Sequence, residues 1–178
     1  SEEEARDIAS ELDWTMREDA GRGWRLVVAS PEPKHIVDIS LIDALAKRGA
    51  VVIAGGGGGI PVVRDARKVR HGVEAVIDKD LTSALMANVL GIEVMMILTG
   101  VSRVAINYRT PDERPLGQVT LSQARRYLAE GQFPAGSMGP KVAAAIGFLE
   151  RGGKRAVIGH LNEALPALRG ETGTHIVP

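Results

Sequence analysis

Short apolar runs that alternate with segments of helical periodicity constrain the fold of this chain more than any other feature. In chain order these segments are an apolar run at 50–54, a helix from about Lys79, an apolar run at 92–98, helices from about Ser122 and Lys141, an apolar run at 155–159 and a helix at 161–168. Strands that are apolar at every position are buried on both faces, as in parallel sheets that helices cover on both sides. The sequence therefore predicts an α/β fold with a mainly parallel sheet sandwiched between helices.

The amino-terminal region has a different pattern. Residues 2–12 are amphipathic, with acidic side chains in the first turn, and predict a helix. The segment WTMREDAGRGWRLVV predicts a strand, a polar turn at Asp19–Gly23 and a second strand at Trp24–Val28. A further helix is expected at Asp38–Arg48.

The composition excludes several classes of function. The chain has 178 residues with 22 basic and 22 acidic side chains, so no overall field favours nucleic acid or an anionic membrane. It has no cysteine for a disulfide or a thiolate metal site, and its histidines have no ligand-like spacing, so no metal site is expected from His35, His71, His160 and His175. The apolar runs are far shorter than a bilayer span, and the acidic SEEEARDI start is unlike a signal peptide. We expect a cytoplasmic protein.

The stretch AGGGGGIPVV, residues 54–63, carries five consecutive glycines directly after an apolar run. It does not fit the dinucleotide-binding pattern, since Ile60 or Pro61 occupies the place of the third glycine, and no Gly-Lys-Ser/Thr follows as in a P-loop. Two interpretations are open: a flexible turn, or a loop whose backbone N–H groups approach a phosphate. The entropy lost in ordering five glycines favours contact with a ligand.

The segment VEAVIDKDLTSALMANVLG places Asp78, Lys79 and Asp80 between an apolar strand and an apolar helix. Such a group of charges is often a solvated helix cap. Ligands of parallel sheets bind at the carboxyl ends of strands, and there Lys79 would neutralise a transferring phosphoryl group. Asp80 would then hold that lysine or organise a metal.

A second lysine follows the glycine-containing stretch GSMGPK, residues 136–141. Ser137 is suited to cap a helix and Pro140 to begin it, which places Lys141 in the first turn. The helix dipole disfavours a cation there unless the lysine reaches an anion bound at the helix end. We therefore expect Lys79 and Lys141 to converge on one anion. Phosphoryl transfer depends on such positioned positive charge more than on a nucleophile supplied by the protein.

Six motifs in this order resemble those of carbamate kinases, members of the amino-acid-kinase fold family. They are EDAGRGWRLVVASPEP, VVIAGGGGGIPVV, GVEAVIDKD, MILTGVSRVAINY, GSMGPKV and ETGTHI. The resemblance covers essentially the whole chain. It implies reversible phosphoryl transfer between ATP and carbamate, which gives ADP and carbamoyl phosphate, with Mg²⁺ and in a homodimer.

The resemblance also implies a role for individual residues. Lys79 and Lys141 would stabilise the migrating phosphoryl group, and Asp80 would orient the lysines. Residues 1–26 would be part of a small protruding subdomain, and residues 27–178 the nucleotide-binding lobe. The phosphates and the nucleoside would contact Gly56, Gly57, Gly58, Gly59, Thr99, Gly100, Val101, Ala105, Met138, Gly139 and Pro140.

The chain departs from the family pattern in two ways. Gly100 stands where the family often has aspartate, and Ala105 where it often has an aromatic residue, which weakens the expected contacts to ribose and adenine by about 1 kcal/mol or more. Carbamate kinases are also nearly twice this length, and the other half supplies a phosphate loop and the carbamate pocket. We expect residues 1–178 to be the retained part of a longer protein and inactive alone. Alternatively, the rest of the protein is on another chain. The alternative to an enzyme is a non-catalytic nucleotide-binding or regulatory module.

Overall fold

The computed structural model describes residues 1–19, 21 and 23–178, which form two compact units. The first unit comprises residues 1–32 and 60–77, and the second comprises residues 33–59 and 78–178. A parallel bridge between Ala29 and Ala75 joins the two segments of the first unit. For this reason residues 60–77 group with the amino-terminal segment, whereas the boundary predicted at residue 26 assigns them to the larger lobe.

The described residues of the first unit form one helix and two strand pairs. The helix α1 spans Glu2–Leu12, as predicted, and begins with a capping box between Ser1 and Glu4. The strands β1 (Met16–Glu18) and β2 (Trp24–Leu26) pair antiparallel, so the second strand ends two residues earlier than expected. The turn predicted between them includes residues 20 and 22, which lie outside the described residues.

The second strand pair is the hairpin of β3 (Val62–Arg64) and β4 (Arg70–Gly72). In its turn, the Asp65 carboxylate accepts hydrogen bonds from two backbone N–H groups and contacts Nε2 of His71 at 3.0 Å. The hydrogen bond to His71, followed by the one from the Val69 backbone, lowers the pKa of Asp65. His71, in β4, is thus an exposed residue, one of the two roles, surface or packing, expected for the histidines.

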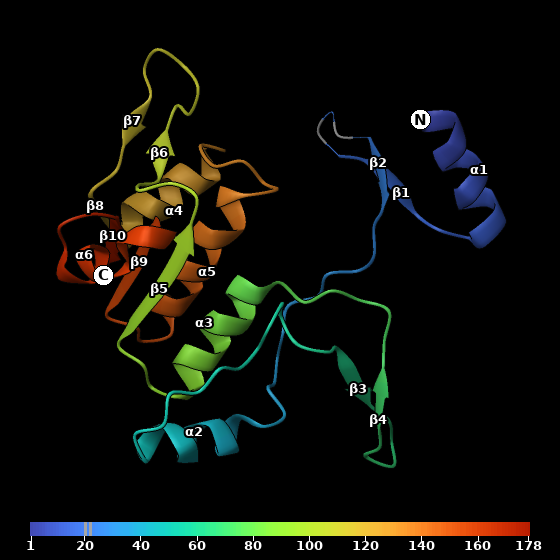
Figure 1. The fold of residues 1–178 in the computed structure, drawn as a ribbon, viewed down its shortest axis with the longest axis horizontal. Coiled ribbons are helices and arrows are strands. Elements are labelled where there is room, and N and C mark those ends of the chain that lie inside the picture. The colour runs from blue at the N-terminus through green and yellow to red at the C-terminus, as the bar shows by residue number, and fades with distance from the viewer. Residues whose placement is uncertain (20, 22) are drawn as a thin grey trace. The chain divides into compact units, whose positions relative to one another are not determined.

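The second unit is built on a four-stranded sheet in the order β5-β9-β10-β8 (Figure 1). Two of the three pairings, β5 with β9 and β10 with β8, are parallel, and β10 runs antiparallel to β9. The sheet is therefore mixed and mostly parallel. Its strands are β5 (Val94–Thr99), β8 (Gln118–Thr120), β9 (Arg155–His160) and β10 (Thr174–Val177). Neither β8 nor β10 was predicted from the sequence.

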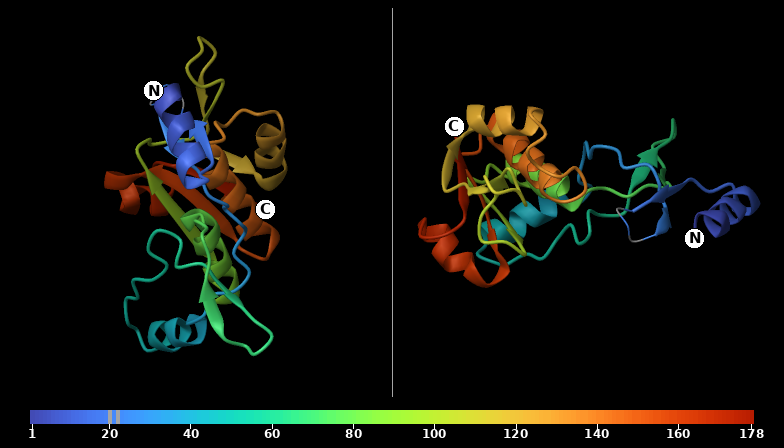
Figure 2. Two further views of the ribbon diagram at one scale, coloured as in Figure 1. Left: turned by 90° about the vertical axis from the view of Figure 1, so that its right-hand side faces the viewer. Right: turned by 90° about the horizontal axis from the view of Figure 1, so that it is seen from above.

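Helices cover both faces of this sheet, which confirms the predicted α/β sandwich. Figure 2 shows α4 and α5 on one face and α6 on the opposite face. On the α6 side, a Cβ added at Gly159 of β9 would lie 3.3 Å from the Ala167 side chain, so helix and strand approach closely. The helices are α2 (Ile39–Lys47), α3 (Lys79–Val89), α4 (Leu121–Ala129), α5 (Met138–Glu150) and α6 (Ala164–Arg169), with a 3₁₀ turn at Leu161–Glu163 and short strands β6 (Ala105–Ile106) and β7 (Arg114–Pro115).

The core lies between the sheet and α5. Ile158 of β9 and Phe148 of α5 are completely buried. At the edge of the core the Thr174 hydroxyl accepts a hydrogen bond from the backbone N–H of Val104 at 2.8 Å and donates one to the carbonyl of Leu116 at 2.6 Å. This buried pair of bonds fixes the segment that follows β5 against β10.

One prediction about the sheet is wrong, because residues 50–54 form no strand. Val51 is 97 % exposed and Ile53 is 99 % exposed. A strand needs a neighbour for its backbone N–H and C=O groups, and among the described residues none pairs with this run. Apolarity alone therefore did not produce a strand here.

No helix in the described part of the chain is both long enough and apolar enough to cross a bilayer.

We predict that two equivalent valine truncations differ sharply. Val157→Ala, at a position that is 0 % exposed, should lower the free energy of unfolding by about 2 kcal/mol, because it leaves a cavity. Val51→Ala should change it by less than about 0.5 kcal/mol. Urea denaturation followed by far-UV circular dichroism measures both. Equal losses for the two variants would contradict the burial that we describe.

Candidate functional site

The site begins at the first turn of α3. The Asp78 side chain caps this helix and accepts hydrogen bonds from the backbone N–H groups of Asp80 at 2.8 Å and Leu81 at 3.1 Å. A carboxylate at this position also complements the positive end of the helix dipole. The cap interpretation of these charges therefore holds for Asp78, while Lys79 and Asp80 are left to project from the first turn.

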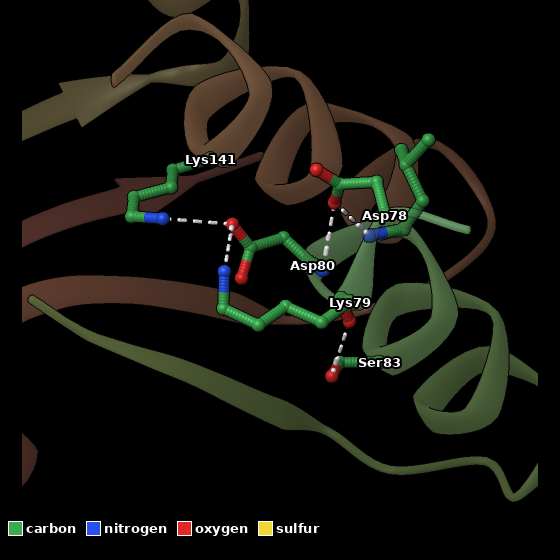
Figure 3. A network of polar contacts seen from close by, with 6 residues as sticks. Asp78, Lys79, Asp80, Ser83 and Lys141 are labelled. Carbon is green, nitrogen blue, oxygen red and sulfur yellow. Dashed lines mark hydrogen bonds and ion pairs between the residues drawn. The ribbon is translucent and has the colours of Figure 1, made fainter. Parts of the chain in front are cut away.

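Asp80 lies between two lysines, as Figure 3 shows. Its Oδ2 atom accepts a hydrogen bond from Nζ of Lys141 at 2.9 Å and lies 3.9 Å from Nζ of Lys79. The side chains of Asp80 and Lys141 are 8 % and 16 % exposed, whereas that of Lys79 is 58 % exposed. The structure thus brings Lys79, Asp80 and Lys141 together, with one ammonium group fixed and the other open to solvent.

This arrangement concentrates positive charge beside a nearly buried carboxylate. Lys79, Asp80 and Lys141 contribute two ammonium groups and one carboxylate, while the Asp78 carboxylate accepts hydrogen bonds from the helix N-terminus. An ammonium group has three N–H donors, so Lys141 retains two after its bond to Asp80. The cluster can therefore donate several hydrogen bonds to an anion such as a phosphate.

The second lysine comes from the first turn of α5. Ser137 occupies the N-cap position, but its side chain makes no capping hydrogen bond, so the predicted cap is wrong in this detail. Met138 is the first helical residue and Pro140 the third, where the missing N–H of proline is tolerated. Gly139 permits the turn because an added Cβ would lie only 3.1 Å from the carbonyl oxygen of Pro134.

The glycine-rich loop adjoins α3 in the same unit. Positive φ angles occur at Gly55 (78°), Gly56 (48°), Gly58 (134°) and Gly59 (94°), which are conformations that other L-residues rarely adopt. The backbone N–H of Gly58 donates to the carbonyl of Gly55 at 2.9 Å and closes a turn. Gly56, Gly57 and Gly59 are exposed, so their backbone groups are accessible to a ligand.

The other predicted nucleoside contacts lie elsewhere in this unit. Thr99 is the last residue of β5 and pairs with His160 of β9 at the carboxyl ends of both strands. Gly100 is exposed, and Val101 and Ala105 are partly buried. In the part of the chain that the structure describes, no hydrogen bond or ion pair joins these residues, or Met138 to Pro140, to the charged cluster.

Sequence reasoning missed one residue that belongs to the site. The Thr82 hydroxyl, one turn after Asp78, donates a hydrogen bond to the carbonyl of Gly58 at 2.8 Å. Thr82 is 5 % exposed. The sequence contains no signal for this bond, since 24 residues separate its two partners.

The charged cluster is not a metal site by itself. Within residues 1–19, 21 and 23–178, no group of three or more His, Asp or Glu side chains could hold a metal ion. His160 caps the 3₁₀ turn through Nδ1, and Nε2 of His175 contacts the carbonyl of Thr172, so both are structural.

Comparison with known proteins gives consistent matches. The sequence profile of the Amino acid kinase family matches residues 8–160. The chain is 53 % identical over 176 residues to the carbamate kinase of Thermococcus kodakarensis and 52 % identical over 166 residues to the carbamate kinase-like protein YahI of Escherichia coli. These alignments cover 99 % and 93 % of this chain but 56 % and 52 % of the relatives.

A solved structure is similar over nearly the whole of this chain. The carbamate kinase from Giardia lamblia bound to AMP-PNP superimposes with a TM-score of 0.89 and 47 % sequence identity. The match covers 99 % of this chain and 56 % of that one. The chain thus spans slightly more than half the length of the proteins that it resembles.

We predict a measurable coupling between Asp80 and Lys141. A double-mutant cycle of Asp80→Asn and Lys141→Met should give a coupling free energy of about 1–3 kcal/mol. Asp80→Asn leaves Lys141 without its carboxylate, and Lys141→Met leaves the nearly buried Asp80 with the more distant Lys79. The control is the exposed pair Glu93 and Lys154, for which Glu93→Gln and Lys154→Met should couple by less than about 1 kcal/mol. Urea denaturation measures both cycles. A coupling no larger than that of the control would contradict a buried ion pair.

Proposed function

Because this chain belongs to the amino acid kinase family, we propose that it forms the nucleotide-binding and phosphoryl-transfer part of a carbamate kinase. The observation that carries the proposal is that Lys79, at the start of α3, and Lys141, in the first turn of α5, converge on Asp80. The chain that holds them has 53 % sequence identity to a carbamate kinase. The reaction is reversible transfer of the terminal phosphoryl group of ATP to a carbamate oxygen, which gives ADP and carbamoyl phosphate.

The lysines supply the electrostatic part of this reaction. Negative charge on the oxygens of a migrating phosphoryl group is stabilised by positive groups that are already in position. Lys141 is held in place by Asp80, and its two remaining N–H donors are free to face those oxygens. Lys79 is more exposed and would reach the same oxygens from the solvent side. Asp80 then acts as the residue that orients both ammonium groups.

The nucleotide would extend from this cluster. We propose that the backbone N–H groups of the glycine loop, Gly56 to Gly59, approach the phosphates, with no side chain to obstruct them. The nucleoside would lie among Thr99 to Val101, Ala105 and Met138 to Pro140, as the family resemblance implies. That the Giardia lamblia carbamate kinase is bound to AMP-PNP supports a nucleotide ligand.

Mg²⁺ fits this site only together with the nucleotide. Mg²⁺ is usually held by one or two carboxylates and by substrate phosphates, not by a protein cage. The described residues provide no group of three ligands, and Oδ2 of Asp80 already faces both lysines. When bound, the ion would neutralise charge on the phosphates that hold it.

The remaining properties of the whole protein are part of the same proposal. The chain spans 56 % of the length of its Thermococcus kodakarensis relative, so the carbamate pocket would come from residues outside these 178. We expect no turnover from the 178 residues alone, and a cytoplasmic homodimer for the whole protein.

Catalysis is testable in a chimera. We predict that the Thermococcus kodakarensis carbamate kinase, with its aligned segment replaced by these residues, forms ATP from ADP and carbamoyl phosphate. Lys141→Ala in this chimera should lower kcat by about 100-fold or more, because charge stabilisation at the transferring group is lost. Coupled-enzyme detection of ATP gives the rates.

The matched control for this change is Lys154→Ala, which removes an exposed lysine outside the cluster and should leave kcat unchanged. Circular dichroism checks that both chimeras fold. An active chimera in which Lys141→Ala has no effect would contradict the assigned role of the lysine. A folded chimera that binds ADP without turnover would favour the non-catalytic module.

Nucleotide affinity is testable at Gly100. An added Cβ there would have no heavy atom within 4 Å, so a side chain fits without strain. We predict that Gly100→Asp, which restores the carboxylate often found in the family, tightens AMP-PNP binding about threefold to tenfold through a hydrogen bond to the ribose. Gly100→Asn is the uncharged control, with a smaller gain. Calorimetry in which neither variant binds more tightly than the wild type would reject this placement of the nucleoside.

A further inference from the structure

The side chain of Thr82 joins two parts of the site that are far apart in sequence. Its hydroxyl donates a hydrogen bond to the carbonyl of Gly58 at 2.8 Å, and its methyl group lies 3.7 Å from the position of a Cβ on Gly55. Thr82 is only 5 % exposed, and Gly58 is also buried. The Thr82 side chain thus bonds to Gly58 at one end of the turn and lies near Gly55 at the other.

This contact is unusual for a threonine inside a helix. Serine and threonine in helices commonly donate to the carbonyl four residues earlier in the same helix. The next residue, Ser83, does so, since its hydroxyl donates to the carbonyl of Lys79 at 2.8 Å. The Thr82 hydroxyl instead donates out of the helix, to the loop. A role limited to stabilising α3 does not explain this direction.

The conformation of the loop is entropically unfavourable and requires a stabilising contact. Residues with positive φ angles at Gly55, Gly56, Gly58 and Gly59 have lost much conformational entropy. Without the Thr82 hydroxyl, the buried Gly58 carbonyl would lack this donor, and an unsatisfied buried carbonyl favours opening of the loop to water.

The position of Thr82 links the loop to the lysine cluster. Thr82 follows Asp80 by two residues and Lys79 by three in the first turns of α3, and its backbone N–H donates to the carbonyl of Asp78 at 3.0 Å. The side chain that bonds to the loop and the side chains of Lys79 and Asp80 therefore all come from α3.

We propose that Thr82 is a positioning residue that holds the glycine loop in its phosphate-receiving conformation beside Lys79 and Asp80. The inference deepens the proposed function and rests on it for the identity of the ligand. Thr82 does not touch the reacting atoms. It acts through the backbone of Gly58, and its substitution should reduce both the order of the loop and the affinity for nucleotide phosphates.

Hydrogen exchange and nucleotide binding test this proposal on the 178-residue protein. Thr82→Val keeps the shape and removes the hydroxyl, and Thr82→Ser keeps the hydroxyl. We expect amide exchange in residues 55–59 to be about tenfold faster in Thr82→Val, and AMP-PNP to bind about tenfold more weakly. Thr82→Ser should stay within about threefold of the wild type in both measurements.

Two controls separate positioning from general destabilisation. Ser83→Ala removes the neighbouring hydroxyl that bonds within the helix and should change neither measurement. Exchange in residues 142–149 of α5 reports on the stability of the core and should be unaffected in every variant. If Thr82→Val does not fold, Thr82→Ala replaces it.

Each outcome decides the proposal. Unchanged exchange of the loop in Thr82→Val would overturn it, as would faster exchange with unchanged AMP-PNP affinity, or equal effects of Thr82→Val and Thr82→Ser. Wild-type protein that binds no AMP-PNP would overturn the proposed function and with it the phosphate-receiving role. In that case the exchange data would still show whether Thr82 orders the loop, so the two failures are distinguishable.

Discussion

The ion pair between Asp80 and Lys141 is the interaction on which the rest of the site depends. Asp80 is almost buried, and a buried carboxylate requires a charged or hydrogen-bonding partner. Its partner comes from another helix, so the first turns of α3 and α5 are locked together at their positive ends. With Lys79 beside it, the pair places two ammonium groups at the starts of two helices, where the helix dipole disfavours a cation unless an anion is bound.

The glycine loop needs conformational order, whereas the charged residues need neutralising partners. The conformational freedom of glycine would let this backbone approach a ligand closely, but the same freedom opposes a single defined conformation. A buried hydroxyl on a rigid helix resolves this conflict with one hydrogen bond, since Thr82 holds Gly58 while the neighbouring glycines stay exposed. One side chain of α3 thus joins the glycine loop to the helix that carries Lys79 and Asp80.

Burial is distributed unevenly over the chain. The sheet of the second unit is covered by helices on both faces, and Val157 and Ile158 on its strand β9 are completely buried. The run at 50–54 is just as apolar, yet Val51 and Ile53 are almost completely exposed. Strand formation depends on backbone partners from other segments, and this run has none among the described residues.

The sequence by itself determined the α/β class, the helices α1, α3, α4 and α5, and the candidacy of Lys79, Asp80 and Lys141, because periodicity, caps and motifs are local properties. Tertiary structure alone decided that Asp80 pairs with Lys141, that Thr82 bonds to Gly58, and that residues 50–54 do not become a strand. Each of these outcomes depends on which distant segment lies within hydrogen-bonding distance. Local sequence patterns carry no information about that distance.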